Sequence, residues 1–323
     1  MFEYLLRKIK RSKFKNYPFK HTYIENFFNH HDFKKITSSK EICLKNLKSD
    51  NDLFNNLFNN NYKIINFPGC ITNQTKYINW HKNKKKYNLK NNSACESAGM
   101  TLRLDPKNYF LKKISAFFNG KIFNKVIAKK FNINFSDCYI DGGIQKYLDG
   151  YEISPHPDLR KKALTFMINI NPNENSKNRN HHTHYLKFKK DKEYIKYFWE
   201  GNPDAERPWL PWNYCESVFT QKKNNSIVIF SPSNDTLHAV KADYNHLVGQ
   251  RTQLYGNLWF KNSKNKKIYS WEDFELLHDE KNLYNELNKT KIKSIFYNMI
   301  PNKFLNYYRK KINKGKYRYR DND

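Results

Sequence analysis

The chain has 323 residues, 38% hydrophobic and 16% aromatic, enough to bury a sizeable core in one large domain with extensions or in two small ones. No stretch approaches the roughly 18 uncharged apolar residues of a membrane span, and charge enters too early at the N-terminus for a secretory signal. The cysteines are odd in number and never in CxxC spacing, so we expect reduced thiols in a cytoplasmic protein.

The net charge of +29 is unevenly distributed along the chain. Residues 135–262 carry 17 basic and 14 acidic residues, an excess of only three, so the rest of the charge lies in the flanks. Only 10 of the 59 basic residues are Arg, and the abundance of Lys, Asn and Ile is typical of an AT-rich genome. A basic channel for a polyanion is therefore not indicated, and we do not expect nucleic acid as a partner.

The N-terminal third is predicted to be largely helical. Residues 1–20 form a basic amphipathic segment with apolar residues at roughly helical spacing. The elements expected next are a short strand leading into a helix from residue 23, a Lys-rich surface loop over 73–92, a strand over 100–104, and helices over 105–118 and 123–131.

From Tyr139 the pattern changes to short strands separated by Gly, Pro and Asn. The expected strands are residues 144–147, 164–170, 185–188, 226–230 and 253–260. Such strands favour a sandwich or barrel over βαβ units. Residues 171–216 are long and polar, typical of a lid or substrate-binding insertion. Its Trp199, Trp209 and Trp212 could stack on a sugar ring, but we favour packing.

The C-terminal residues 263–323 form a third region. Apolar residues recur at helical spacing, and residues 301–320 contain eight basic residues and no acidic one. A basic helix with an apolar face fits an anionic membrane surface, to which the protein would bind peripherally. The alternative is that both terminal segments are ordinary packing helices. The sequence does not indicate an oligomeric state.

The strongest chemical signal is His156-Pro157-Asp158, followed 82 residues after its histidine by His238. In an extended strand end, residues two apart point the same way, so His156 and Asp158 can share one ligand. Two histidines and one carboxylate form the triad that holds Fe(II) and leaves coordination positions open. Arg251 follows 13 residues after His238, and its planar guanidinium suits a dicarboxylate cosubstrate.

Three segments carry a resemblance to a known family: residues 145–158 with 164–171, residues 231–240, and residues 251–260. They resemble the Fe(II)/2-oxoglutarate-dependent oxygenase superfamily, in particular its prolyl-4-hydroxylase-like branch, over roughly residues 95–262. The resemblance implies a mainly β fold with flanking helices (α+β) around a double-stranded β-helix, or jelly-roll, core.

The resemblance also implies roles for individual residues. His156, Asp158 and His238 match the family's iron ligands, and Arg251 matches the residue that pairs with the distal carboxylate of 2-oxoglutarate. Tyr147 lies where relatives often place a tyrosine toward this cosubstrate, although a core tyrosine is the alternative.

The implied organisation has three parts. Residues 1–20 are the basic N-terminal segment. Residues 21–262 are the oxygenase domain, and residues 263–323 are the basic helical extension. Within the domain, helical support occupies 21–134 and the jelly-roll core occupies 135–262, with the insertion at 171–216.

The reaction implied is hydroxylation of a C–H bond by O₂, coupled to decarboxylation of 2-oxoglutarate to succinate and CO₂. Retention of Asp158 favours hydroxylation over halogenation, since halogenating relatives lack this carboxylate. As substrate we favour a small metabolite or a saccharide or lipid-linked surface molecule over a protein prolyl residue. The alternatives are a prolyl hydroxylase-like enzyme or nucleic-acid dealkylase of the same fold, and a non-catalytic cupin-like metal-binding module. Arg251 speaks against the module, which needs no dicarboxylate clamp.

The sequence departs from the family at His181, His182 and His184, where relatives often carry a Gly-Gly pair. These histidines could form a second metal site, or one could bind a polar substrate. We favour a polar loop that exposes the imidazoles.

Overall fold

The computed structural model describes residues 2–263 apart from residues 46, 84–93 and 173. The described strands form two antiparallel sheets, one of seven strands and one of four. The strands are β1 His21–Glu25, β2 Tyr62–Ile64, β3 Thr101–Leu104, β4 Cys138–Tyr147, β5 Glu152–His156, β6 Lys162–Asn169, β7 Thr183–Phe188, β8 Cys215–Thr220, β9 Ser226–Phe230, β10 His238–Lys241 and β11 Arg251–Phe260. The helices are α1 Glu3–Arg11, α2 His30–Thr37, α3 Asp50–Asn59, α4 Gln74–Lys82, α6 Tyr109–Phe118, α7 Lys121–Lys130 and α8 Tyr194–Gly201.

The strand order defines a jelly roll. The larger sheet runs β1-β9-β6-β11-β4-β3-β2 and the smaller sheet β5-β10-β7-β8, so the eight strands from β4 to β11 are divided equally between two facing sheets. Eight antiparallel strands shared between two sheets in this way form the jelly-roll architecture. The expected mainly β fold with flanking helices and a jelly-roll core is confirmed.

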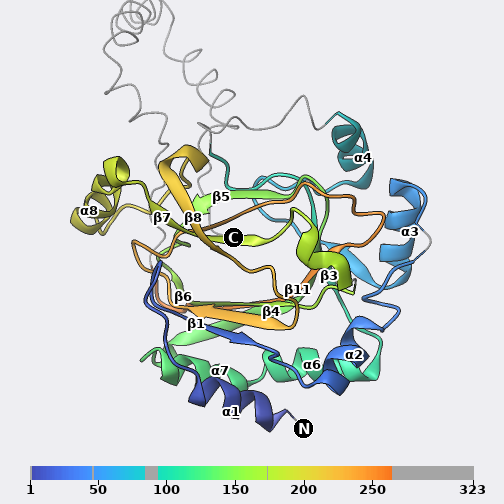
Figure 1. Ribbon diagram of the computed structural model, residues 1–323, viewed down its shortest axis with the longest axis horizontal. Helices are drawn as coiled ribbons and strands as arrows, with labels where there is room; N and C mark the ends of the chain where they lie inside the picture. Colours follow the sequence, from blue (N-terminus) through green and yellow to red (C-terminus); the bar gives the residue numbers. More distant parts are fainter. Residues whose placement is uncertain (1, 46, 84–93, 173, 264–323) are drawn as a thin grey trace, which may run out of the picture.

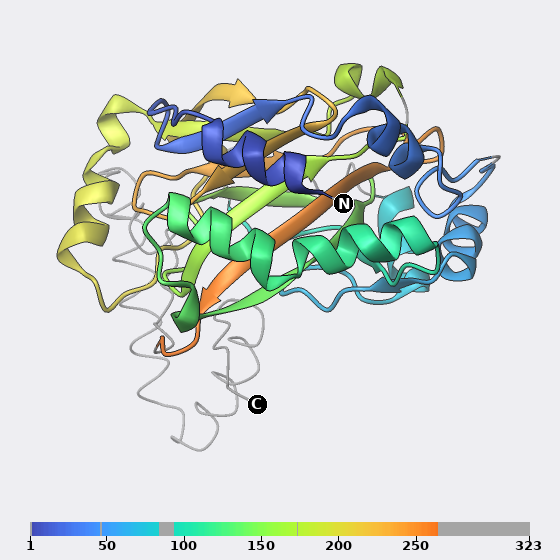
Figure 2. The ribbon, with the colours of Figure 1, turned by 90° about the horizontal axis from the view of Figure 1, so that it is seen from below.

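Helices α1, α2, α6 and α7 lie along the outer face of the larger sheet, on the side away from the smaller sheet (Figures 1 and 2). The apolar stripe of α6 is buried at Leu111, Ile114 and Phe118, as its sequence spacing predicts. The Phe118 and Phe166 rings lie 5.9 Å apart, which joins this helix to β6. Burying an apolar side chain of this size stabilises the fold by about 1.5–3 kcal/mol.

The amphipathic pattern at the N-terminus is used for packing. In α1 the side chains of Leu5, Leu6 and Ile9 are buried, and the ring of Phe2 lies 5.1 Å from that of Phe117. The apolar face of α1 is thus part of the same core as the helices beside it. The corresponding prediction for the C-terminal extension falls on residues 264–323, outside the described residues. Within the described part, no helix combines the length and hydropathy needed to span a bilayer.

Two sequence expectations need correction. The sequence predicts a loop over residues 73–92, but α4 occupies residues 74–82. The Asn73 side chain caps the first turn of this helix by accepting from the Lys76 N–H, and Tyr77 anchors the helix in the core.

The insertion at 171–216 is also shorter than expected. It contains β7, a strand of the smaller sheet between β10 and β8, so only the segment between β7 and β8, with α8, stands outside the jelly roll.

Candidate metal centre

His156, Asp158 and His238 meet inside the jelly roll. His156 ends β5 and His238 begins β10, and the two residues are direct partners in the antiparallel register of the smaller sheet. Their rings therefore lie side by side, with centroids 4.2 Å apart. Asp158 reaches them from the turn that follows β5, where its φ is +66°. The strand alternation invoked from the sequence is thus not what orients this carboxylate, because Asp158 adopts the left-handed conformation.

The three donor groups have the spacing of ligands to one ion. Asp158 Oδ1 lies 3.5 Å from His156 Nε2 and 3.8 Å from His238 Nε2. Atoms that bind a common ion at about 2.1 Å lie roughly 3–4 Å apart. All three side chains are buried, at 4–6% exposure, so water competes little for these positions.

Hydrogen bonds orient both imidazoles. His156 Nδ1 lies 2.8 Å from the Ser154 carbonyl oxygen and His238 Nδ1 lies 3.1 Å from that of Thr236. A carbonyl oxygen only accepts, so each Nδ1 carries the hydrogen and each Nε2 lone pair faces Asp158. Burial, and then the proximity of His156, lower the pKa of His238 to about 3, which keeps this imidazole in the neutral form that binds metals.

Asp158 is held in its ionised form. Lys162 Nζ donates to Oδ1 at 2.5 Å, and Thr165 Oγ1 donates to Oδ2 at 2.7 Å. Burial alone would raise the pKa of Asp158, but Lys162 and the two histidines outweigh it and hold the pKa well below the usual range. These contacts also restrict the rotation of the carboxylate.

Arg251 opens β11 and pairs in register with Tyr147 on β4. Its Nη2 donates to Thr183 Oγ1 at 3.0 Å and to Gln253 Oε1 at 2.9 Å, and its Cζ lies 4.3 Å from the centre of the Tyr147 ring. The buried Nη1 has no hydrogen-bond partner, and no carboxylate of the described residues lies within ion-pair distance. An unpaired buried guanidinium is costly, so this position suits an anionic ligand.

Tyr147 is buried against Arg251, with its hydroxyl 2.7 Å from the side-chain amide of Gln145. In the amide orientation that satisfies both neighbours, Gln145 donates to the Tyr147 oxygen and accepts from Arg103. The phenolic hydrogen of Tyr147 is then available to a ligand. Burial raises the pKa of this phenol, so it remains a donor at neutral pH.

One cavity of about 500 Å³ joins these residues. Its lining includes all five residues proposed from the sequence: His156, Asp158, His238, Arg251 and Tyr147. The remaining wall is mixed, with apolar and aromatic side chains alongside charged ones such as Arg103, Asp141 and Lys162. A cavity of this size accommodates a small molecule together with a cosubstrate.

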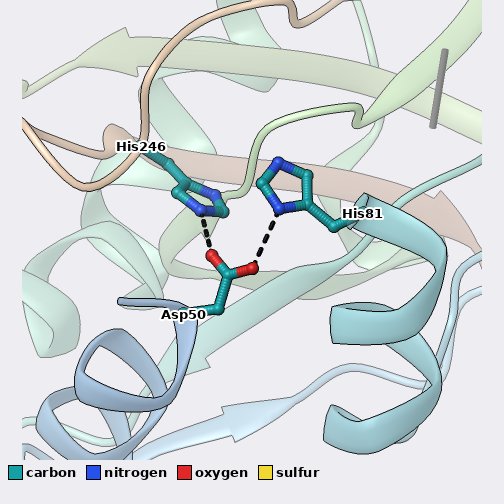
Figure 3. Close-up of side chains that lie close together, drawn as sticks. All are labelled: Asp50, His81 and His246. Carbon is teal, nitrogen blue, oxygen red and sulfur yellow. Dashed lines mark hydrogen bonds and ion pairs between the residues drawn. The ribbon is translucent and has the colours of Figure 1, made fainter. Parts of the chain in front are cut away.

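A second group of two histidines and one aspartate was not expected from the sequence. Asp50 from the first turn of α3, His81 from the end of α4 and His246 from the loop before β11 lie together, with both imidazoles directed at Asp50 (Figure 3). Asp50 Oδ2 is 2.9 Å from His81 Nδ1, and Oδ1 is 2.7 Å from His246 Nε2. These residues are up to 196 positions apart, so no local spacing could indicate the cluster.

In this second cluster the imidazole nitrogens that face the carboxylates carry hydrogens. The other nitrogen of His81 lies 2.8 Å from Asp149 Oδ2, so His81 stands between two carboxylates and donates to both. Burial would lower the pKa of His81, but the hydrogen bonds and charges of Asp149 and Asp50 raise it to about 9. His246 Nδ1 accepts from the Asp149 N–H at 3.1 Å, so its hydrogen is on Nε2. The group is an ion-paired clasp that joins helices α3 and α4 to the loops that carry Asp149 and His246.

The histidines at 181, 182 and 184 do not form an exposed loop. His181 and His182 are buried, at 1% and 4% exposure, and His184 lies in β7, 2.9 Å from Ser217 Oγ. Burial first, and then neighbouring positive charge, lower the pKa of His181 to about 2 and of His182 to about 4. The expectation of exposed imidazoles is wrong because this stretch leads directly into a core strand. Among the described residues, the three do not form a metal-type cluster.

No protein-family model and no curated protein matches the chain. Solved structures that are similar to it include a Pseudomonas putida prolyl-4-hydroxylase, 8% identical over 81% of this chain and 100% of the other, with a TM-score of 0.38. A Trichoplax adhaerens prolyl hydroxylase in complex with a peptide fragment is 10% identical over 80% and 88%, with a TM-score of 0.38.

A third similar structure is EvdO2 from Micromonospora carbonacea, complexed with 2-oxoglutarate, at 8% identity over 71% and 97% with a TM-score of 0.28. The first two of these proteins are prolyl hydroxylases, the branch that the sequence resemblance names. At such TM-scores the likeness adds no argument to the strand order and site geometry of the chain itself.

Proposed function

We propose that this chain is an Fe(II)- and 2-oxoglutarate-dependent oxygenase that hydroxylates a C–H bond of a small molecule. The observation that carries the proposal is one cavity lined by a His-Asp-His cluster and by a buried arginine with an unpaired N–H group. The cluster alone would fit a simple metal-binding module. The guanidinium of Arg251 supports the assignment as an enzyme, because its unpaired N–H group fits a second, anionic ligand beside the metal in the same cavity.

The donor set fits Fe(II). His156 and His238 would bind through Nε2 and Asp158 through a carboxylate oxygen, and three protein ligands on one face leave positions open for other ligands. When bound, iron and 2-oxoglutarate would supply the oxidising chemistry, in which 2-oxoglutarate, O₂ and the substrate C–H bond are converted to succinate, CO₂ and a hydroxylated substrate. Thr165, whose hydroxyl donates to Oδ2, would keep the Asp158 carboxylate oriented, and the positive charge of Lys162 would keep it ionised.

Arg251 would bind the distal carboxylate of 2-oxoglutarate. Its Nη1 is the unpaired donor, while Nη2 is anchored by Thr183 and Gln253, so the guanidinium is already oriented. Tyr147 would stack on the guanidinium and donate its phenolic hydrogen to the same ligand. A preorganised charged donor of this kind loses little entropy on binding.

A small-molecule or saccharide substrate is supported by the size of the cavity, about 500 Å³ including the space for the cosubstrate. Peripheral contact with an anionic membrane, and hence a lipid-linked substrate, remains a prediction. Liposome co-sedimentation before and after deletion of residues 291–323 tests it, and unchanged binding would remove the membrane argument.

The proposal is tested by adding Fe(II) and 2-oxoglutarate to the protein without oxygen and recording the visible charge-transfer band. We expect the band for the native chain and for His81→Gln, which alters the second cluster, and its loss for His156→Ala. Arg251→Gln should weaken 2-oxoglutarate binding by about 2–5 kcal/mol, as expected for loss of a buried charge partner. A native protein that binds Fe(II) but develops no band with 2-oxoglutarate would leave only the metal-binding module.

A further inference from the structure

A second buried arginine lines the same cavity on the side of Asp158. Arg207, in the segment between β7 and β8, is 4% exposed. Its Nη2 donates to the Asp158 carbonyl oxygen at 3.0 Å and its Nη1 donates to Asn234 Oδ1 at 3.3 Å. These contacts fix the guanidinium beside the metal ligands without supplying it with a negative partner.

Trp209 lies next to Arg207 in the cavity wall. Residues two apart in an extended segment face the same side, and both side chains line the cavity. The Trp209 ring lies 6.3 Å from the His156 ring. The following residue, Leu210, is buried and its N–H donates to the Pro155 carbonyl oxygen at 2.7 Å, which ties this segment to the strand that ends in His156.

Both side chains hold a buried donor with no acceptor. Arg207 Nε and Trp209 Nε1 have no hydrogen-bond partner, and no carboxylate in the described part of the chain lies within ion-pair distance of Arg207. By contrast, two other cations of the cavity wall are paired, Arg103 with Asp141 at 2.8 Å and Lys162 with Asp158 at 2.5 Å. The carboxylates of Glu206, Asp158 and Asp235 act on Arg207 only from beyond ion-pair distance. A buried guanidinium that lacks a direct anionic partner is unfavourable, so the arrangement is suited to an anion that enters from solution.

The charges of the wall lead to the same conclusion. The cavity is lined by four cationic side chains (Arg103, Lys162, Arg207, Arg251) and three carboxylates (Glu96, Asp141, Asp158). Fe(II) and the dianion of 2-oxoglutarate would cancel one another. One positive charge then remains, and Arg251 is already assigned to the cosubstrate.

We propose that Arg207 and Trp209 bind an anionic oxygen group of the primary substrate, a carboxylate or a phosphate ester, and so place the neighbouring carbon beside the metal. This inference rests on the proposed function and names the substrate class of that site. An anionic oxygen group consists only of acceptors, which is what two unpaired N–H donors require. Arg207 shares no hydrogen-bond partner with Arg251, so the two arginines would bind different ligands.

The test is calorimetric titration of the full chain, loaded with Fe(II) and 2-oxoglutarate under anaerobic conditions, with benzoate, phenyl phosphate and benzamide. We expect at least one of the two anions to bind roughly tenfold or more tightly than neutral benzamide. Trp209→Phe removes one N–H and keeps an aromatic ring, and should weaken anion binding by roughly tenfold. The ratio of benzoate to phenyl phosphate affinity separates a carboxylate from a phosphate ester.

The matched control is Trp212→Phe, three residues away, whose Nε1 already donates to Glu152 Oε1 at 2.8 Å. This variant should leave anion binding unchanged. Equal binding of benzamide and both anions, no binding of either anion, or equal effects of the two tryptophan variants would overturn the inference. So would a loss of 2-oxoglutarate affinity in Trp209→Phe, since the pair would then serve the cosubstrate.

The same titrations with metal-free protein separate this inference from the proposed function. Arg207 and Trp209 are held by the protein's own contacts, so the part of the anion affinity that Trp209→Phe removes should persist without iron. Selective anion binding that Trp209→Phe weakens, without a charge-transfer band, would contradict the oxygenase and leave the anion site standing.

Discussion

Two clusters in this molecule have the same composition and different chemistry. His156, Asp158 and His238 form one, and Asp50, His81 and His246 form the other, each with its donor atoms within 4.8 Å of one another. In the first, backbone carbonyls hold the Nδ1 hydrogens, so both Nε2 lone pairs face the carboxylate. In the second, the nitrogens that face Asp50 carry hydrogens (Figure 3).

The hydrogen-bond partners of the outward-facing imidazole nitrogens decide whether a His-His-Asp group can bind a metal. His246 accepts a backbone N–H at Nδ1, so a metal at its Nε2 would require removal of its only ring hydrogen. His81 lies between two carboxylates, and its pKa is raised to about 9, whereas burial lowers that of His238 to about 3. The group of His156, Asp158 and His238 therefore has an arrangement that suits a metal ion, and the group of Asp50, His81 and His246 is an ion-paired clasp.

The largest effect is expected on metal affinity. His156→Ala removes one of the three proposed ligands and should lower Fe(II) or Co(II) affinity by at least about 100-fold. The loss of a residue that only hydrogen-bonds to a metal ligand already costs about 10–100-fold. His81→Ala should leave the affinity unchanged. Calorimetric titration of both variants with Co(II) measures this, and a loss of binding in His81→Ala alone would reverse the assignment of the two clusters.

The second effect is on stability. Asp50→Asn removes the negative charge and replaces one of the two acceptor oxygens, which bind His81 and His246, by an NH₂ donor, and it should cost about 2–4 kcal/mol of unfolding free energy. Urea denaturation monitored by circular dichroism gives the value. The control is Lys63→Gln, which breaks the exposed pair with Asp105 at 3.2 Å and should cost much less, because solvent screens an exposed pair. Equal costs for the two variants would show that the clasp is only a surface ion pair.

The third effect is on pH dependence. The pKa of His81 is raised in the folded state from 6.5 to about 9, so its contribution is complete below pH 6.5 and is lost as the pH rises through 9. The loss should be on the order of 2–3 kcal/mol and absent in His81→Gln. Burial would raise the pKa of Asp50, but hydrogen bonds from His246 and His81 outweigh it and lower this pKa, so this acceptor stays ionised across the range. Unfolding free energies of both proteins from pH 6 to 10 test this, and parallel curves would contradict it.

The smallest effect concerns the support of Asp158. Thr165→Val preserves the shape of the side chain and removes the hydroxyl that donates to Oδ2 at 2.7 Å. Metal affinity should fall by about tenfold, the lower end of the range for such supporting contacts. Thr22→Val, at a fully buried threonine whose hydroxyl has no partner, is the matched control and should not change metal affinity. An unchanged affinity in Thr165→Val would mean that Lys162 alone orients the carboxylate.

Much of the fold could be predicted from local patterns. Strands β6 and β9 are runs of apolar residues buried along their whole length, and α6 and α7 carry their apolar residues at helical spacing. Local patterns do not predict helix α4, because Tyr77 is its only fully buried side chain and the helix therefore has no apolar periodicity. The sequence predicts a strand over 185–188, but the length and polarity of residues 171–216 place it in an insertion rather than in the smaller sheet, where β7 lies.

Local patterns in the sequence predict five of the eight jelly-roll strands, β4, β6, β7, β9 and β11, and the residue types and order of His156, Asp158 and His238 predict the metal cluster. Strands β5, β8 and β10 are not predicted, although β5 and β10 carry the two histidines. Arg251 and Tyr147 follow from the same register, as partners on adjacent strands. Two features depend on the folded structure and have no local signal. These are the unpaired donors of Arg207, Trp209 and Arg251 in the cavity, and the meeting of Asp50, His81 and His246. Whether a buried donor finds an acceptor depends on groups that the fold brings together from distant parts of the chain, and the local spacing of residues does not indicate these groups.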